Sequence, residues 1–293
     1  MDSIDVPVFI VGGSRTGSEL LKNIIYLNTD IDMVPEMWLL TPFWINKSFL
    51  SYANLKSDSK IDQFKVNSLI DLVFSKKCQS AFWQNIEKME VDENELKQYL
   101  LSSERECGEF FGEVLRLRAK ARNKRVMGAK FPLHFAYTEL LIKWFPNCKI
   151  IHTIRDPRAS YASQLIKHKK VKKGLLRQKY SAILQFIHIV TQYRWQVKIH
   201  KKLSQYPNYL LFKYEDFVGN PEFRLRELCE FLQVEYKDSM LSPTIKNTSH
   251  GINKSTATKI SKDSILSWKT ILSPVVSKII VVINKRAMTD LDY

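Results

Sequence analysis

The chain has 293 residues, of which 45% are hydrophobic and 26% are charged. This ordinary globular balance excludes a disordered or collagen-like chain. No stretch approaches the ~18–20 consecutive apolar residues of a membrane-spanning helix. The apolar segment 6–13 is too short for the core of a signal peptide and lacks the basic leader. We therefore expect a cytoplasmic protein that forms a single domain over residues 1–293.

Lys and Arg number 45 and Asp and Glu 30, which gives a formal net charge of +15. Such a charge calls for a negatively charged partner: nucleic acid, an acidic membrane surface, an acidic polymer or a phosphate-rich cofactor. No helix-turn-helix, zinc or RNA-binding motif accompanies the charge, so we expect no nucleic-acid partner, and a basic nucleic-acid-binding module stays as an alternative. Four cysteines without a C-x-x-C pair favour reduced, buried thiols.

Strands alternate with helices along most of the chain. The apolar run 6–11 predicts a buried strand, and an amphipathic helix follows the glycine-rich segment 12–17. A second strand is expected to end near Pro35. Residues 42–125 are polar and mostly helical in pattern, which predicts a helical insertion with core residues Trp83, Leu96, Leu100, Phe110 and Leu115.

The rest of the chain continues this alternation. Strands are expected at 125–130, 149–154 and 209–213, helices up to 145, from 157, over 175–203, around 225–232 and over 274–286, and a polar loop over 246–263. The pattern predicts an α/β fold with a P-loop-like, doubly wound parallel sheet flanked by helices.

A glycine-rich loop, Gly12-Gly13-Ser14-Arg15-Thr16-Gly17, joins the first strand to the first helix. Glycines here let the backbone approach an anion, and the N–H groups at the start of the helix point at it. The spacing therefore predicts a phosphate-binding loop, with a plain strand-to-helix turn as the alternative.

The residues around this loop argue against a kinase, which stays as the alternative enzyme class. A nucleoside triphosphatase has Lys-Ser or Lys-Thr after the last glycine, whereas this chain has Ser18-Glu19. Asp156, at the end of a strand, could imitate the magnesium-binding acid, but that lysine is missing. The cation is instead Arg15, inside the loop, where it can stabilise negative charge on a group being transferred.

A second anion site is predicted at the end of the strand 149–154, where Arg155-Asp-Pro-Arg precedes a helix. A helix that begins at Pro157 brings Ser163 back to within one or two turns of the strand end. An arginine and a hydroxyl held together can bind a phosphate monoester; alternatively, Arg155 only forms an ion pair with Asp156. Two phosphate sites at the carboxyl ends of parallel strands fit a cofactor with phosphates at two positions.

These residues resemble the two signatures of sulfotransferases that use 3′-phosphoadenosine-5′-phosphosulfate (PAPS). The segment Phe9-Ile-Val-Gly-Gly-Ser-Arg-Thr-Gly-Ser-Glu-Leu-Leu21 is similar to the family's 5′-phosphosulfate loop, and Arg155-Asp-Pro-Arg with Ser163 is similar to its second signature. The resemblance implies that Gly12–Glu19 bind the phosphosulfate and that Arg155 and Ser163 hold the 3′-phosphate. The family usually has Thr or Ser in place of Glu19.

The resemblance extends to the later part of the chain. Tyr214-Glu-Asp-Phe is like the family's Tyr-Glu-Asp-Leu segment, which makes Tyr214 either a neighbour of the adenine or a packing residue. The segment Lys254-Ser-Thr-Ala-Thr-Lys-Ile-Ser-Lys262 resembles the basic C-terminal segment that closes over the 3′-phosphate side. Ser255 and Lys259 are expected to contribute there.

For the chemistry, the resemblance implies PAPS as co-substrate and 3′-phosphoadenosine-5′-phosphate (PAP) as product, without a metal. Arg15 would meet the charge on the leaving phosphate, and Lys130 would supply a second cation near the sulfuryl oxygens. In the branch shared by protein-tyrosine and bacterial carbohydrate-type sulfotransferases, a glutamate after the first helix is the base; Glu36 matches it, with His134 as the rival. We expect the acceptor to be a hydroxyl or amine of a small molecule or carbohydrate, bound partly by the insertion 42–125.

Overall fold

The structure is a computed structural model of the chain. It describes residues 6–34, 55–56, 59–74, 90–104, 106–169, 175–246, 255–257, 260 and 262–293. The chain forms two compact units. Unit 1 comprises residues 1–11 and 25–150, and unit 2 comprises residues 12–24 and 151–293.

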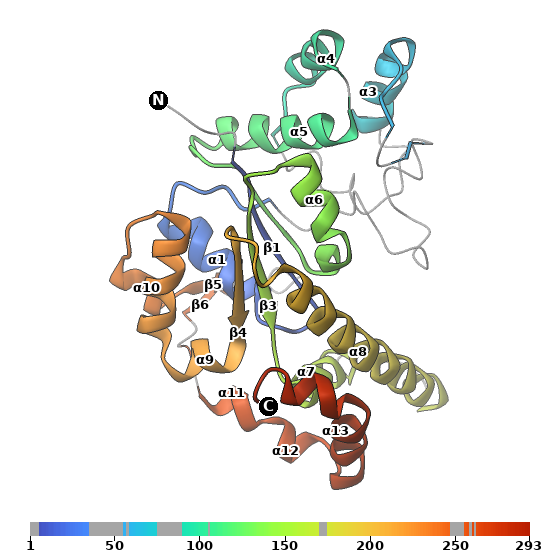
Figure 1. The fold of residues 1–293 in the computed structure, drawn as a ribbon, viewed down its shortest axis with the longest axis vertical. Helices are drawn as coiled ribbons and strands as arrows, with labels where there is room; N and C mark the ends of the chain where they lie inside the picture. Colours follow the sequence, from blue (N-terminus) through green and yellow to red (C-terminus); the bar gives the residue numbers. More distant parts are fainter. Residues whose placement is uncertain are drawn as a thin grey trace. The chain divides into compact units, whose positions relative to one another are not determined.

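Four strands form one sheet in the order β2-β1-β3-β4 (Figure 1). They are β1 (Val8–Gly12), β2 (Gly128–Phe131), β3 (Lys149–Ile154) and β4 (Tyr209–Lys213). β1 and β2 pair in parallel, with Ile10 opposite Lys130. Because β1 is flanked by β2 on one side and β3 on the other, the switch point of the topology lies at the carboxyl ends of β1 and β3. The predicted α/β fold with a parallel sheet is confirmed.

The core of unit 1 forms around β1, whose residues are buried throughout. The ring of Phe9 stacks on that of Phe111, with centroids 6.2 Å apart, and lies 5.7 Å from that of Phe145. A continuous apolar strand of this kind belongs in the middle of a sheet covered on both faces. Besides β1 and β2, the unit contains η1 (Gln63–Lys65), α3 (Val66–Phe74), α4 (Glu93–Ser102), α5 (Cys107–Ala121), η3 (Pro132–Tyr137) and α6 (Thr138–Trp144).

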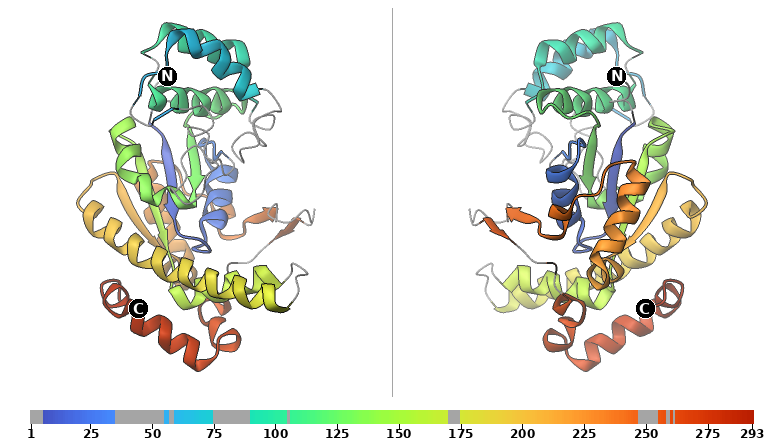
Figure 2. Two further views of the ribbon diagram at one scale, coloured as in Figure 1. Left: turned by 90° about the vertical axis from the view of Figure 1, so that its right-hand side faces the viewer. Right: turned by 90° about the vertical axis from the view of Figure 1, so that its left-hand side faces the viewer.

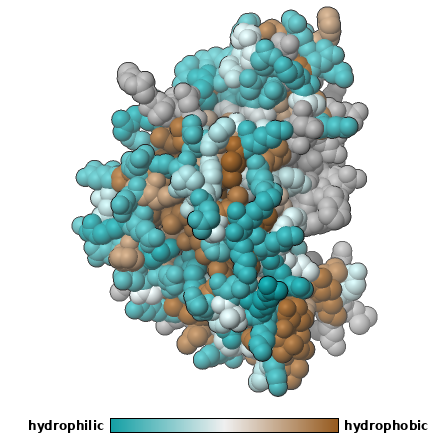
Figure 3. Space-filling model, viewed as in Figure 1, coloured by the Kyte–Doolittle hydropathy of each residue, from teal (hydrophilic) through white to brown (hydrophobic). Residues whose placement is uncertain are grey.

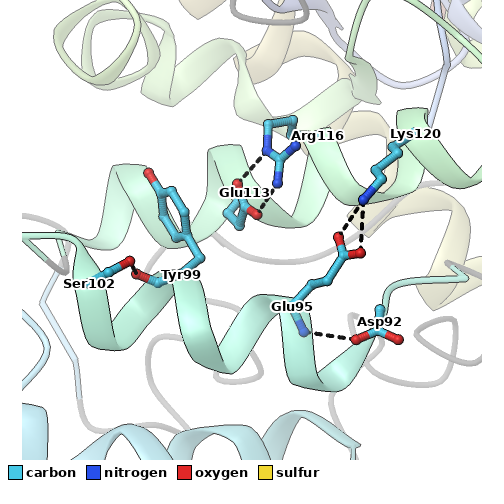
Figure 4. Close-up of polar contacts among 7 residues, drawn as sticks. All are labelled: Asp92, Glu95, Tyr99, Ser102, Glu113, Arg116 and Lys120. Carbon is cyan, nitrogen blue, oxygen red and sulfur yellow. Dashed lines mark hydrogen bonds and ion pairs between the residues drawn. The ribbon is translucent and has the colours of Figure 1, made fainter.

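The described part of the segment 42–125 is mostly helical, as predicted. Four of the expected core residues are buried, namely Leu96, Leu100, Phe110 and Leu115, and Trp83 lies outside the described residues. Charged side chains link α4 to α5 on the surface (Figure 4). Lys120 donates to both carboxylate oxygens of Glu95 at 2.8 and 2.9 Å, and the Asp92 side chain caps α4 by accepting the N–H of Glu95 at 2.8 Å.

Unit 2 carries most of the helices after β3. They are α7 (Pro157–Lys169), α8 (Leu175–Leu203), α9 (Tyr214–Gly219), α10 (Pro221–Leu232), η4 (Asp238–Leu241), α11 (Asp263–Leu266), α12 (Trp268–Ile271) and α13 (Pro274–Thr289). Helix α1 (Ser18–Asn28) begins in this unit, directly after the glycine-rich loop. The predicted strands at 149–154 and 209–213 and the helix over 175–203 have the expected bounds.

Three local predictions need correction. The strand expected at 125–130 begins only at Gly128. In place of the second strand expected to end near Pro35, Ile31 and Val34 form isolated parallel bridges with Val126 and Ala129. The segment 246–263 is not only a loop, because β6 (Ser255–Ala257) pairs antiparallel with β5 (Thr244–Lys246). Backbone pairing between two short polar segments leaves no hydrophobic pattern in the sequence.

Cys107, Cys148 and Cys229 are buried thiols, and Cys78 lies outside the described residues. Within the described ranges, no helix is both long enough and apolar enough to cross a membrane.

Candidate functional site

The loop between β1 and α1 is shaped by its glycines and lies against the end of β3. Gly12 has φ +148°, and a Cβ there would lie 2.3 Å from the carbonyl oxygen of Thr153. Gly17 has φ +88°, and a Cβ there would lie 2.5 Å from the ring of Tyr214. A residue with a Cβ at Gly12 or Gly17 would therefore fit neither the backbone conformation nor the available space. Within the loop, the Thr16 hydroxyl donates to the Gly13 carbonyl at 2.9 Å, and it lies 2.8 Å from the Thr153 hydroxyl.

Two glutamines of α8 hold the backbone of the loop. The Gly13 N–H donates to Gln196 Oε1 at 2.6 Å, and the Ser14 N–H donates to Gln192 Oε1 at 3.2 Å. Both glutamines are buried. They are four residues apart, so they lie on one face of the helix, one turn from each other. The first two amides after Gly12 are thereby satisfied by side chains, and the amides at the start of α1 remain oriented toward its N-terminal end.

Two arginines meet at this switch point. Arg15 has φ +68°, an unusual backbone conformation for a side chain of its size, and its Nε donates to Ser163 Oγ at 3.0 Å. Arg155 Nη1 donates to the Arg15 carbonyl at 3.4 Å. Burial, and after it the positive charge of Arg155, lower the pKa of the Arg15 guanidinium. The hydrogen bonds of both guanidiniums among the described residues go to hydroxyl and carbonyl oxygens rather than to carboxylates.

Arg155 is fixed by Tyr214 and by a residue from the C-terminal segment. Its guanidinium lies over the Tyr214 ring, 4.1 Å from the centroid, and its Nη2 donates to the Ser264 carbonyl at 2.8 Å. The Tyr214 and Ser264 hydroxyls are 2.9 Å apart. The Nε of Arg155 is buried and has no hydrogen-bond partner among the described residues. An unsatisfied buried donor on a cation is what an anionic ligand would satisfy.

The neighbouring carboxylates are bound to other groups. Both oxygens of Asp156 accept hydrogen bonds from Arg158 at 2.6–3.0 Å, so the alternative of an Arg155–Asp156 ion pair is not what the structure contains. Glu19 pairs with Lys22 at 2.6 Å. Among the described residues, no cluster of three or more His, Cys, Asp or Glu side chains is placed to hold a metal ion.

The family model described as the sulfotransferase family matches residues 7–238. The chain belongs to this family. The matched range contains the glycine-rich loop, Arg155, Ser163 and Tyr214, so the family-level resemblance stated from these motifs is confirmed.

Among curated proteins, this chain is 29% identical over 119 residues to omega-hydroxy-beta-dihydromenaquinone-9 sulfotransferase Stf3 of Mycobacterium bovis. The match covers 38% of this chain and only 29% of that protein. Among solved structures, the sulfotransferase domain of the Synechococcus PCC 7002 olefin synthase has a TM-score of 0.60 at 16% identity, covering 100% of this chain and 97% of that one. Mouse sulfotransferase SULT7A1 complexed with PAP has a TM-score of 0.53 at 12% identity, covering 100% and 88%. These two likenesses support the fold.

The predicted site residues divide between the two units. The loop residues, Arg155, Ser163 and Tyr214 come together in unit 2, where Ser163 accepts a hydrogen bond from Arg15. That Ser163 and Arg155 hold one phosphate together stays a prediction. Unit 1 contains Lys130, which is buried on β2, and His134, which is buried with its ring 4.3 Å from that of Phe131.

Two other predicted residues, Glu36 and Lys259, lie outside the described residues. The segment that leads to Glu36 is held beside β2, since the Val34 N–H donates to the Gly128 carbonyl at 2.9 Å. The backbone of Ser255 lies in β6, opposite Lys246.

Sequence reasoning missed Gln192, Gln196, Thr153 and Ser264. For the glutamines a signal was available: two amide side chains four residues apart sit among the apolar residues of Val190–Val197. A polar pair at that spacing on the inner face of a helix needs a buried partner. Ser264 carries no such signal, because a serine in a polar segment is ordinary.

Proposed function

We propose that this sulfotransferase moves the sulfuryl group of PAPS to a hydroxyl or amine of a small-molecule or carbohydrate acceptor and releases PAP. The observation that carries the proposal is the buried guanidinium of Arg155, which donates to the backbone carbonyl of Arg15 at the switch point of the sheet. A buried cation that lies close enough to a second arginine to act on its pKa is unfavourable without compensating negative charge. An anion bound between the loop and Arg155 would supply it.

The residues of unit 2 fit a ligand with two phosphate groups. The loop residues Gly12–Glu19 would hold the phosphosulfate, because Arg15 lies in this loop and the N-terminus of α1 follows it directly. Arg155 has an unsatisfied Nε to offer to the 3′-phosphate. Ser163, bonded to Arg15, adds a hydroxyl on the same side. The mouse structure with PAP bound has the same fold, which is consistent with this assignment.

The reaction needs a cation at the leaving group and a base at the acceptor. In sulfuryl transfer the acceptor atom forms a bond to sulfur, the bond from sulfur to the phosphate oxygen breaks, and the acceptor proton goes to a base. Arg15 would stabilise the charge that develops on the departing phosphate. Lys130 would stand near the sulfuryl oxygens, and Glu36 would take the proton, with His134 as the rival.

A binding experiment tests the cofactor without knowledge of the acceptor. PAP should raise the melting temperature well above the effect of AMP, which lacks the 3′-phosphate, because a ligand that binds the native state stabilises it. Arg155→Ala should weaken PAP binding about 10–100-fold, since a hydrogen bond to a charged group contributes about 1.5–3 kcal/mol. Arg194→Ala, which removes an exposed arginine of α8, is the matched control. If ATP with magnesium stabilises the protein more than PAP, the chain acts as a kinase instead.

A screen of acceptors with PAPS tests the transfer itself. The product should gain the mass of one SO3, and PAP should appear in equal amount. Once an acceptor is identified, Arg15→Ala should lower turnover more than it lowers PAP affinity, because the negative charge on the departing phosphate grows in the transition state. Unchanged turnover in this variant would remove Arg15 from the mechanism.

A further inference from the structure

Helix α13 has an apolar face on each side. Val276 and Ile280 pack inward against Tyr161, Ile189 and Val190 in the cluster that joins α13 to α7 and α8. In Figure 2, α13 is the long red helix near the C-terminus. A second apolar set faces outward: Val275, Ile279, Val282 and Ile283 are 41–67% exposed. This spacing forms a continuous stripe on a helix. The inner set packs α13 against α7 and α8, whereas the four outer residues are not part of that cluster.

Helix α8 carries a similar outward stripe near its start. Tyr180, Ile183, Leu184 and Ile187 follow each other at helical spacing and are 46–65% exposed. In Figure 3, brown residues gather at the lower right, over α13 and the adjoining part of α8. We call these two stripes together the α8–α13 apolar face. Exposed aliphatic side chains gathered in this way mark an interaction surface rather than ordinary solvent-facing helices.

The same part of the chain is strongly cationic. Residues 157–214 contain 13 Lys and Arg and no Asp or Glu. Residues 264–289 contain four Lys and Arg and likewise no Asp or Glu. On α13, Lys278 and Arg286 are exposed and lie three or four residues from members of the stripe, so they are its neighbours on the helix surface. Long basic side chains in this position can keep their charge in a polar layer while their stems lie along apolar surface.

We propose that the α8–α13 apolar face docks the enzyme onto the surface of a bilayer that contains anionic lipid. Such a surface offers negative headgroups above an apolar layer, and it matches a stripe of aliphatic side chains edged by cations. A second copy of this chain would bring like charges together around the stripe. A nucleic acid would satisfy the cations but leave the aliphatic side chains without a partner.

Vesicle flotation of the full chain tests the proposal, and it needs neither PAPS nor an acceptor. The protein should float with phosphatidylglycerol–phosphatidylcholine vesicles and much less with pure phosphatidylcholine, and added salt should weaken the binding. The variant Ile279→Ser/Val282→Ser should lower the partition coefficient at least tenfold. Lys278→Gln/Arg286→Gln should weaken binding to the anionic vesicles and leave the weak binding to phosphatidylcholine unchanged.

The controls separate this surface from general stickiness. Phe223→Ser removes an exposed aromatic ring of α10 that lies outside the face, and it should bind as the parent does. Melting curves verify that each variant is folded. Equal binding of the parent and Ile279→Ser/Val282→Ser would overturn the proposal. The proposal would also fail if the parent did not bind vesicles but self-associated, and Ile279→Ser/Val282→Ser abolished that self-association. It would fail as well if the parent did not bind vesicles but bound duplex DNA tightly. Because catalysis is not measured, the result does not depend on the proposed sulfotransferase reaction.

Discussion

The contact between Gly13 and Gln196 allows a direct test of how the phosphate-binding loop is held. The Gly13 N–H donates to Gln196 Oε1 at 2.6 Å, and Gln196 Nε2 donates to the Gln192 carbonyl at 3.3 Å. A Cβ on Gly13 would lie 2.4 Å from that Nε2 atom. Gly13→Ala must therefore displace the Gln196 amide, and the Gly13 N–H loses its acceptor.

The expected free energies follow from this single bond. A buried N–H left without an acceptor costs about 1–3 kcal/mol, so Gly13→Ala and Gln196→Ala should each lower the free energy of unfolding by about that amount. In the double variant the shortened side chain removes the clash, and the same bond is lost only once. We therefore expect Gly13→Ala/Gln196→Ala to be about as stable as Gln196→Ala alone. The coupling energy should be about 1–3 kcal/mol, within the range for contacting residues.

Urea unfolding of the parent, both single variants and the double variant measures this coupling. Gln185→Ala serves as the matched control, because Gln185 lies on the same helix and bonds to Gln164 rather than to the loop. Combined with Gly13→Ala, it should be additive to within about 0.5 kcal/mol. PAP affinity, measured in parallel, should fall in the Gly13→Ala variant. Additive effects of Gly13→Ala and Gln196→Ala would show that Gln196 does not hold the loop.

Further predictions concern the charge near the loop, the acid stability and the base. Glu19→Thr should strengthen PAP binding, because it removes a carboxylate beside the anion site, and calorimetry of both proteins measures the difference. Burial lowers the pKa of His152 to about 3, so its imidazole stays neutral in the folded state, whereas the unfolded state takes up a proton below pH ~6.5. Relative to neutral pH, the parent should therefore lose about 2 kcal/mol of folding stability at pH 5, and His152→Gln should not lose it. Urea unfolding at neutral pH and at pH 5 measures this difference. Glu36→Gln should lower turnover ~10²–10⁴-fold with PAP binding intact, and His134→Gln should be much milder; the reverse order would identify His134 as the base.

The strands and the loop could be predicted because their signals are local. Residues 149–154 form a run of mostly β-branched residues bounded by a turn, and the strand has the expected bounds. Pro157 at the first turn fixed the start of α7. The β5–β6 pairing was missed because its partners, Thr244–Lys246 and Ser255–Ala257, are short and have no apolar alternation.

The contacts that shape the site could not be predicted in this way, because they join distant parts of the chain. Gly13 and Gln196 are separated by 183 positions, and Arg155 and Ser264 by 109. The helix geometry predicted Ser163 near the end of β3, and the resemblance paired it with Arg155 at the 3′-phosphate. In the structure Ser163 of α7 accepts a hydrogen bond from Arg15, whose backbone has a left-handed conformation. The amino-acid pattern does not predict that backbone conformation.

The net charge of +15 does not by itself explain why the switch point is cationic; the pairing of the nearby acids does. Glu215 accepts the N–H of Asp156 at 3.0 Å and the hydroxyl of Tyr293 at 2.5 Å, and burial raises the pKa of its carboxyl. Through the first of these hydrogen bonds it positions the backbone directly after Arg155. Asp156 and Glu19 pair with Arg158 and Lys22, and the hydrogen bonds of Arg15 and Arg155 among the described residues go to no carboxylate. Replacing Glu215 with Gln would keep the hydrogen-bonding shape, so PAP affinity should change little, whereas a carboxylate that neutralised Arg155 would make the same substitution strengthen binding.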